Sequence, residues 1–180
     1  MAKKKKTWQE KLATDNGLPK ICPIPERMSA RSGSGTLVIP APREVDALMR
    51  KATAGRLVTI DAMQRALALK HDATIACPIT TGIFAWIAAH AAAEGKGRTT
   101  AYWRTLKSGG ELNPKYPGGI PEQRRLLEEE GHVVVQKGKA LFCAGLRETP
   151  GRPLIIRRVH FNFVAAISET NGAEAVMLFA

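Results

Sequence analysis

The stretch TTAYWRTLKSGGELNPKYPGGIPEQRRLLEEEGH, residues 99–132, joins a cluster of aromatic and Arg side chains to a glycine-rich loop and a polar helix. The cluster is Tyr102, Trp103 and Arg104. Pro121 suits the first turn of a helix and Gly131 suits its end, so a helix is predicted between them. Aromatic rings can stack on nucleobases and Arg binds phosphate, so this stretch carries most of the functional signal.

The segments on either side of this stretch predict further helices and one hairpin. Residues 132–136 and 139–143 are apolar runs separated by Lys137-Gly138, which is the pattern of a β-hairpin. Three helices precede the stretch, each with a capping residue or a proline at its start. They begin at Pro42, at Thr59 or Asp61, and at Thr81, and the last extends to about Ala93.

This order of elements predicts a mainly α fold, a winged helix-turn-helix with a small β-hairpin wing. Residues 1–37 form a basic, Pro/Gly-rich arm, and residues 16–42 are expected to be extended rather than helical. Residues 38–145 are expected to form the domain. Residues 146–180 are an extension of uncertain structure, in which 159–167 could form a strand.

The charge of the chain points to a polyanionic partner. The formal net charge is +11 and the pI is near 10.0, and nucleic acid is the commonest such partner of a soluble protein. The run from Lys3 to Lys6 is more often a solvated tail than a specific contact. No run of 18 apolar residues exists that could cross a bilayer, and the N-terminus lacks the apolar stretch of a secretory signal. We therefore expect a cytoplasmic protein.

The three cysteines, Cys22, Cys77 and Cys143, are far apart and include no Cys-x-x-Cys pair. This spacing predicts neither a metal site nor a disulfide framework. We expect reduced, mostly buried thiols, and no cofactor.

Over residues 42–143, the chain resembles the DNA-binding domain of the methylated-DNA-protein-cysteine methyltransferases, also called alkylguanine-DNA alkyltransferases. Residues 101–104, Ala-Tyr-Trp-Arg, match the family's Pro-Cys-His-Arg loop, which holds the alkyl-accepting cysteine. Residues 116–119, Tyr-Pro-Gly-Gly, are similar to its Tyr-Ser-Gly-Gly segment, in which the Tyr lines the base pocket. Glu130-Gly131 is similar to its closing Glu-Gly, whose carboxylate orients the His.

The resemblance also shows what this chain lacks. Tyr102 stands in the position of the acceptor cysteine and Trp103 in that of the His, so the resemblance implies no catalytic residue. A phenol with a pKa near 10 is a poor nucleophile unless it is activated. Ile60 replaces the Tyr that helps to rotate the nucleotide, and Ile79 replaces the arginine finger. The chain is therefore most similar to the alkyltransferase-like branch, which binds damaged DNA without repairing it.

The resemblance and the positive charge together yield a set of expected DNA-binding residues, each with a structural alternative. A helix N-terminus and basic side chains bind phosphate, and aromatic rings stack on bases. Capping, core packing and ordinary solvation are the alternatives for the same residues. The expected DNA-binding residues are Thr80, Thr81, Arg98, Arg104, Lys137 and Lys139, and the expected base-pocket residues are Tyr102, Trp103 and Tyr116.

We therefore predict a protein that binds duplex or alkyl-damaged DNA, mainly through phosphates. Trp86 and His90 on the helix from Thr81 could face a groove or belong to the core. This Ala-rich helix offers few groups that read base edges, so sequence specificity should be low. Two alternatives remain open, an alkyl-transferring enzyme that uses Cys77 or Cys143 and a winged-helix transcriptional regulator.

Overall fold

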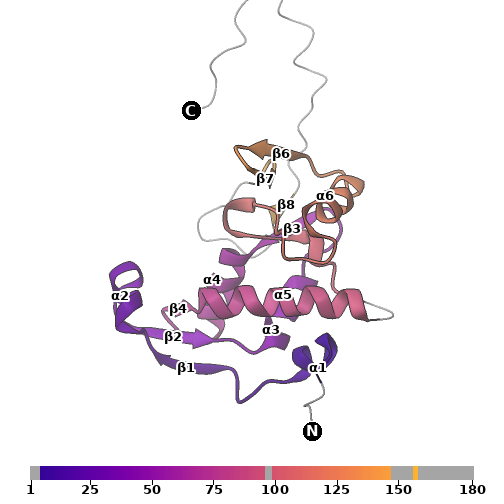
Figure 1. Ribbon diagram of the computed structural model, residues 1–180. Helices are drawn as coiled ribbons and strands as arrows, with labels where there is room; N and C mark the ends of the chain where they lie inside the picture. The colour runs from indigo at the N-terminus through magenta and orange to yellow at the C-terminus, as the bar shows by residue number, and fades with distance from the viewer. Residues whose placement is uncertain (1–4, 96–98, 147–155, 158–180) are drawn as a thin grey trace, which may run out of the picture.

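The computed structural model describes residues 5–95, 99–146 and 156–157, which form six α-helices, two 3₁₀ helices (η) and eight short strands (Figure 1). In chain order these are α1 (Trp8–Ala13), β1 (Lys20–Pro23), α2 (Glu26–Ser32), β2 (Thr36–Ile39), α3 (Pro42–Arg50), β3 (Arg56–Thr59), α4 (Ile60–Lys70), β4 (Ile75–Ala76), α5 (Pro78–Glu94), η1 (Tyr102–Arg104), β5 (Thr105–Leu106), η2 (Ser108–Gly110), α6 (Gly119–Glu129), β6 (Val134–Lys137), β7 (Ala140–Cys143) and β8 (Ile156–Arg157).

Within these described residues the strands form three small sheets. β2 lies between β1, which runs antiparallel to it, and β4, which runs parallel to it. β3 lies between the parallel β5 and the antiparallel β8. β6 and β7 form an antiparallel hairpin in which Val134 is opposite Cys143 and Lys137 is opposite Ala140.

The predicted fold class is therefore wrong. The chain is a mixed α/β protein rather than a mainly α winged helix-turn-helix with a single hairpin wing and an extended N-terminal arm. The hairpin is present, but two further sheets accompany it. Their strands are only two to four residues long, and the parallel pairs join strands that at least two helices separate in the chain. Such short strands carry too little alternation of polar and apolar residues to be detected from the sequence.

The N-terminal segment contains two helices and two strands instead of an extended arm. The expectation of no helix in residues 16–42 is wrong because α2 lies there. α1 begins with a capping box, in which the Thr7 hydroxyl accepts from the Glu10 N–H and the Glu10 carboxylate accepts from the Thr7 N–H. The expected domain boundary at residue 38 lies inside β2.

α5 is the central helix, and α1 and α3 both pack against it (Figure 1). It is apolar on most of its circumference, which is typical of a buried helix. Ala85, Ala88, Ala89 and Ala91 are buried along it, and their small side chains let neighbouring helices approach closely. The main hydrophobic core gathers around this helix, and Val38, Val45, Met49, Val58, Met63 and Leu67 belong to it.

The helices predicted before residue 99 are confirmed. α3 begins at Pro42, and the hydroxyl of Thr59, rather than Asp61, caps α4 by accepting from the Ala62 N–H. α5 begins at Pro78, three residues earlier than predicted. The helix predicted from Pro121 also begins earlier, at Gly119, because Gly118 adopts a left-handed conformation with φ 73° that ends the preceding loop.

A second, smaller apolar cluster lies beneath the stretch from 99 to 132. Its buried members are Leu57, Leu106, Leu112, Leu127 and Cys143. It ties η1, β5 and α6 to the β6–β7 hairpin. Across the described ranges, none of the helices has both the length and the hydropathy needed to cross a bilayer. The expected strand at 159–167 lies outside the described residues.

Candidate functional site

Glu130, at the end of α6, anchors the Tyr102–Arg104 turn. Its Oε1 accepts hydrogen bonds from the Trp103 indole Nε1–H at 2.9 Å and from Arg104 Nη2 at 2.7 Å. The second oxygen, Oε2, accepts from Arg104 Nε at 3.0 Å and from the Gly55 N–H at 3.5 Å. The carboxylate of the Glu-Gly pair therefore holds the turn in place through an indole and a guanidinium.

This anchor is partly buried and charged. The side chains of Arg104 and Glu130 are each only 16% exposed. Burial raises the pKa of Glu130, but hydrogen bonds from Arg104 and Trp103 outweigh it and hold the pKa below its usual value. Arg104 also donates to the Ala52 carbonyl at 2.9 Å. Arg104 was expected to contact phosphate, but its guanidinium is engaged within the protein.

Gln123 on α6 completes the support of the turn, and the sequence reasoning missed it. Its side chain is fully buried, and its Nε2 donates to the carbonyls of Trp103 and Thr105, each at 3.1 Å. Its Oε1 accepts from the Asn113 N–H at 2.7 Å. A glutamine in a helix gives no sequence signal for such a role unless its burial is known.

Two of the expected base-pocket residues, Tyr102 and Tyr116, are buried side by side. Their ring centroids are 5.8 Å apart in an edge-to-face arrangement, and Tyr102 is 8% exposed. The Tyr102 hydroxyl donates to the Pro117 carbonyl at 3.2 Å. Burial and the neighbouring Glu122 raise the pKa of the Tyr102 phenol, which stays protonated at neutral pH. Trp103, the third, is partly buried at the junction of the two apolar clusters.

The Tyr116 hydroxyl is a buried polar group without a satisfied hydrogen bond. No group among the described residues meets hydrogen-bond geometry with it. Burial raises the pKa of this phenol well above its usual value, and the neighbouring Asn113 side chain offsets only part of the effect. The hydroxyl is fully enclosed by the protein, beside the Asn113 side chain.

The threonines at the start of α5 bond within their own helix. Thr81 is fully buried and its hydroxyl donates to the Cys77 carbonyl at 2.8 Å. The Thr80 hydroxyl, partly buried, donates to the same carbonyl at 3.4 Å. Neither hydroxyl caps the helix, whose N-cap is Cys77.

The two expected lysines of the hairpin, Lys137 and Lys139, are exposed at its turn. Lys137 lies 5.8 Å from the ring centroid of Phe142, and neither lysine forms an ion pair with a described residue. Both are therefore available to a phosphate. Arg98 lies outside the described residues.

The outer face of α5 is exposed to solvent at its N-terminal end and is packed against α1 near its C-terminal end. At the N-terminal end, Ile79 is 66% exposed and Ile83 is 44% exposed. At the C-terminal end, Trp8 of α1 stacks on His90 with ring centroids 4.6 Å apart and contacts Trp86 edge to face. α1 therefore packs against the groove-facing candidates Trp86 and His90, whereas the isoleucines at the other end are exposed.

The described cysteines are poorly suited to accept an alkyl group. Cys77 and Cys143 are buried, and burial raises the pKa of the Cys143 thiol to about 11. A thiol with so high a pKa is scarcely ionised at neutral pH, and the thiolate is the nucleophile. Cys22 is partly exposed on β1.

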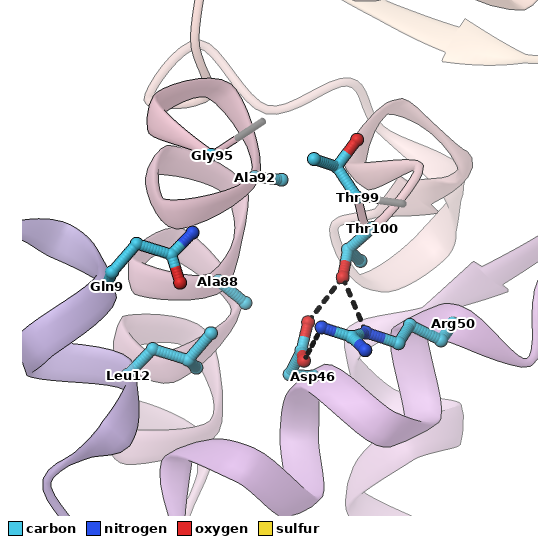
Figure 2. A pocket seen from close by; sticks show the side chains of 9 residues that line it. All are labelled: Gln9, Leu12, Asp46, Arg50, Ala88, Ala92, Gly95, Thr99 and Thr100. Carbon is cyan, nitrogen blue, oxygen red and sulfur yellow. Dashed lines mark hydrogen bonds and ion pairs between the residues drawn. The ribbon is translucent and has the colours of Figure 1, made fainter. Parts of the chain in front are cut away.

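A pocket of about 330 Å³ opens between α1, α3, the end of α5 and Thr99–Thr100 (Figure 2). On one side, the buried Asp46 accepts from the Thr100 hydroxyl at 2.5 Å and pairs with Arg50 at 2.8 Å, while Arg50 Nε donates to Thr100 at 3.0 Å. Leu12, Ala88 and Ala92 supply apolar walls. Because these three polar side chains bond to one another, the network fixes the start of the 99–132 stretch against α3.

Comparisons of the chain with protein-family models, with curated proteins and with solved structures each found no match.

Proposed function

We propose that the protein binds duplex DNA, mainly through phosphates, and neither accepts nor transfers an alkyl group. It would act as the alkyltransferase-like proteins do, by sensing or shielding damaged DNA. The observation that carries this proposal is the convergence around Tyr102. Residues 101–104, 116–119 and 130–131 bear the family resemblance and meet in one place, through Glu130, Tyr102 and Tyr116.

The distribution of charge supports a polyanionic partner. Eight acidic side chains of the described residues are already held in ion pairs: Glu44, Asp46, Asp61, Glu111, Glu122, Glu128, Glu129 and Glu130. Many exposed cations have no such partner within the described residues, among them Lys5, Lys20, Arg27, Lys51, Lys115, Lys137 and Lys139. This unpaired excess is available to DNA phosphates.

The open end of α5 supplies a second kind of contact. Ile79 and Ile83 are exposed one helical turn apart, and the chain between them includes Gly82. Exposed apolar side chains on DNA-binding proteins can wedge between base steps in the minor groove and bend the duplex. α5 carries few groups that read base edges, so binding should depend little on sequence.

The chemistry of Tyr102, Trp103 and Cys143 supports the proposal that no alkyl group is transferred. Tyr102 has a raised pKa and donates its hydroxyl proton to a carbonyl, so it is not a phenolate nucleophile. The Trp103 indole can only donate a hydrogen bond, so it cannot act as the base that a His would supply. Cys143 is held as a neutral thiol by burial.

The test is a titration of the protein against a plain duplex, the same duplex with one alkylguanine, and a single strand, at two salt concentrations. Intact mass is measured after each incubation. We expect binding to the duplexes that weakens steeply with salt, and an unchanged protein mass. A mass increase of one alkyl group would show the enzyme alternative, and no binding to any DNA would refute the proposal.

A further inference from the structure

A second pocket, of about 150 Å³, lies on the other flank of α1. It is separate from the pocket of Figure 2 and from the Tyr102 turn. Segments before and after α1, the start of α3 and the middle of α5 contribute to it. Its lining is Lys6, Lys11, Thr14, Asn16, Leu18, Pro42, Phe84 and Ile87.

One wall of this pocket is apolar, and the other residues that line it are mostly basic or polar. Phe84 and Ile87 of α5 are partly buried against the main core and give an apolar wall. Lys6 and Lys11 contribute two positive charges, and Thr14 and Asn16 contribute polar side chains. No acidic residue lines the pocket, so its charge is not neutralised locally.

The two lysines are held beside the pocket by the docking of α1. The Lys6 ammonium donates to the Thr14 hydroxyl at 3.5 Å, and the Lys11 ammonium lies 3.7 Å from the ring centroid of Trp8. α1 is fastened to α5 through Gln9, whose side chain donates to the Ala91 carbonyl and whose N–H donates to Glu94. Within the described residues neither lysine has a carboxylate partner, and each keeps donors free for an anion.

We propose that this pocket binds one unpaired nucleotide, with the base against Phe84 and Ile87 and the phosphate at Lys6 and Lys11. An apolar wall beside a basic rim complements a nucleotide, whose aromatic base and charged phosphate lie at its two ends. A volume of about 150 Å³ suits a base, while the phosphate stays at the rim. Where the nucleotide belongs to a DNA strand, this inference rests on the proposed function. A free nucleotide would present the same chemistry.

The test compares two double variants of equal charge. Lys6→Gln with Lys11→Gln removes the two pocket lysines, whereas Lys20→Gln with Arg27→Gln removes two exposed cations of the same segment that do not line the pocket. Calorimetric titrations use a twelve-residue oligothymidylate, thymidine monophosphate, thymidine and inorganic phosphate. Circular dichroism and thermal unfolding check that both variants keep the fold.

We expect the pocket variant to bind the oligothymidylate at least tenfold more weakly than the wild type, and the control less than threefold more weakly. Because one fewer phosphate is neutralised, the salt dependence of single-strand binding should also fall by about 0.7 log units per log unit of salt. Thymidine monophosphate should bind the wild type more tightly than thymidine or phosphate does, and this preference should vanish in the pocket variant.

The outcomes separate this inference from the proposed function. If both variants lost the same affinity for the oligothymidylate while the wild type bound duplex DNA, nucleotide binding at this pocket would be refuted. The proposed duplex binding would then be retained. Failure of the wild type to bind any DNA, together with binding of thymidine monophosphate that is abolished in the pocket variant, would refute the proposed function and support the pocket.

Discussion

Trp103 donates its indole Nε1–H to Glu130 Oε1 over 2.9 Å, across 27 positions of the chain. Indole nitrogen donates a hydrogen bond but does not take up a proton under physiological conditions. The contact therefore fixes the shape of the Tyr102–Arg104 turn and cannot relay a proton through it. In the alkylguanine-DNA alkyltransferases, which the chain resembles, the corresponding carboxylate orients a His. In this chain the Glu130 carboxylate is a structural anchor.

Removing this anchor should destabilise the protein. Glu130→Gln leaves the partly buried Arg104 guanidinium without its carboxylate, which should lower the free energy of unfolding by about 1.5–3 kcal/mol. Urea unfolding followed by circular dichroism measures the change. Glu129→Gln is the matched control, because Glu129 lies next in the chain and forms an exposed pair with Arg125. A destabilisation at Glu130 no larger than that at Glu129 would show that the anchor contributes nothing.

Glu44 should make stability depend on pH. Burial raises its pKa, but hydrogen bonds from Lys70, the Ala41 N–H and His71 outweigh burial and lower the pKa below its usual value. A lowered pKa stabilises the fold above the unfolded value, about 4.3, and this stabilisation is lost as pH falls through the folded pKa. Glu44→Gln should therefore cost about 1–3 kcal/mol at pH 7 and much less near pH 3.

Urea unfolding of the wild type and Glu44→Gln at pH 7, 5 and 3 checks this prediction. The stabilities of the two proteins should converge as the pH falls. If the difference in the free energy of unfolding between the two proteins stayed constant from pH 7 to pH 3, the ionised Glu44 carboxylate would interact with its partners no more strongly than the neutral one.

The local elements could be predicted from the sequence because their signals are local. Pro42, Thr59 and Gly131 mark helix ends within a few residues of where they occur, and the Lys137-Gly138 turn marks the hairpin. The sheets could not be predicted, because β2–β4 and β3–β5 pair strands far apart in the chain. The helices of the N-terminal segment were missed because α1 and α2 are only six and seven residues long.

The hairpin lysines should matter more to DNA binding than Arg104 does. Lys137→Ala with Lys139→Ala should weaken duplex binding and lower its salt dependence by about 0.9 log units for each phosphate that is no longer neutralised, with unfolding unchanged. Arg104→Ala should instead reduce stability, because its guanidinium bonds to Glu130 and to the Ala52 carbonyl. Fluorescence anisotropy and urea unfolding distinguish the two. If the double lysine variant bound duplex DNA as tightly as the wild type, the hairpin would not be part of the DNA interface.

The open end of α5 should contact DNA through its isoleucines. Ile79→Glu places a negative charge on a side chain that is 66% exposed, so it should lower duplex affinity at least tenfold without unfolding the protein. Leu69→Glu on α4 is the control, since Leu69 is 85% exposed and its substitution introduces the same charge. Comparable reductions of affinity in both variants would indicate general repulsion rather than a contact at Ile79.

For the candidate site, the sequence predicted which residues of the Tyr102 turn lie together but not their surroundings. The resemblance grouped Tyr102, Trp103, Tyr116 and Glu130, and the structure brings these four together. It could not show that Arg104 would be engaged inside the protein, because burial depends on packing between distant segments. Nor could it place Trp8 on His90, since these residues are far apart in the chain and α1 was not expected to exist.

The most direct test of the central claim is intact-mass analysis of the full protein after saturation with an alkylguanine duplex, combined with an affinity measurement on the same sample. We predict a salt-sensitive complex and a protein mass equal to that before incubation. A mass higher by one alkyl group, or no complex at low salt, would contradict the account.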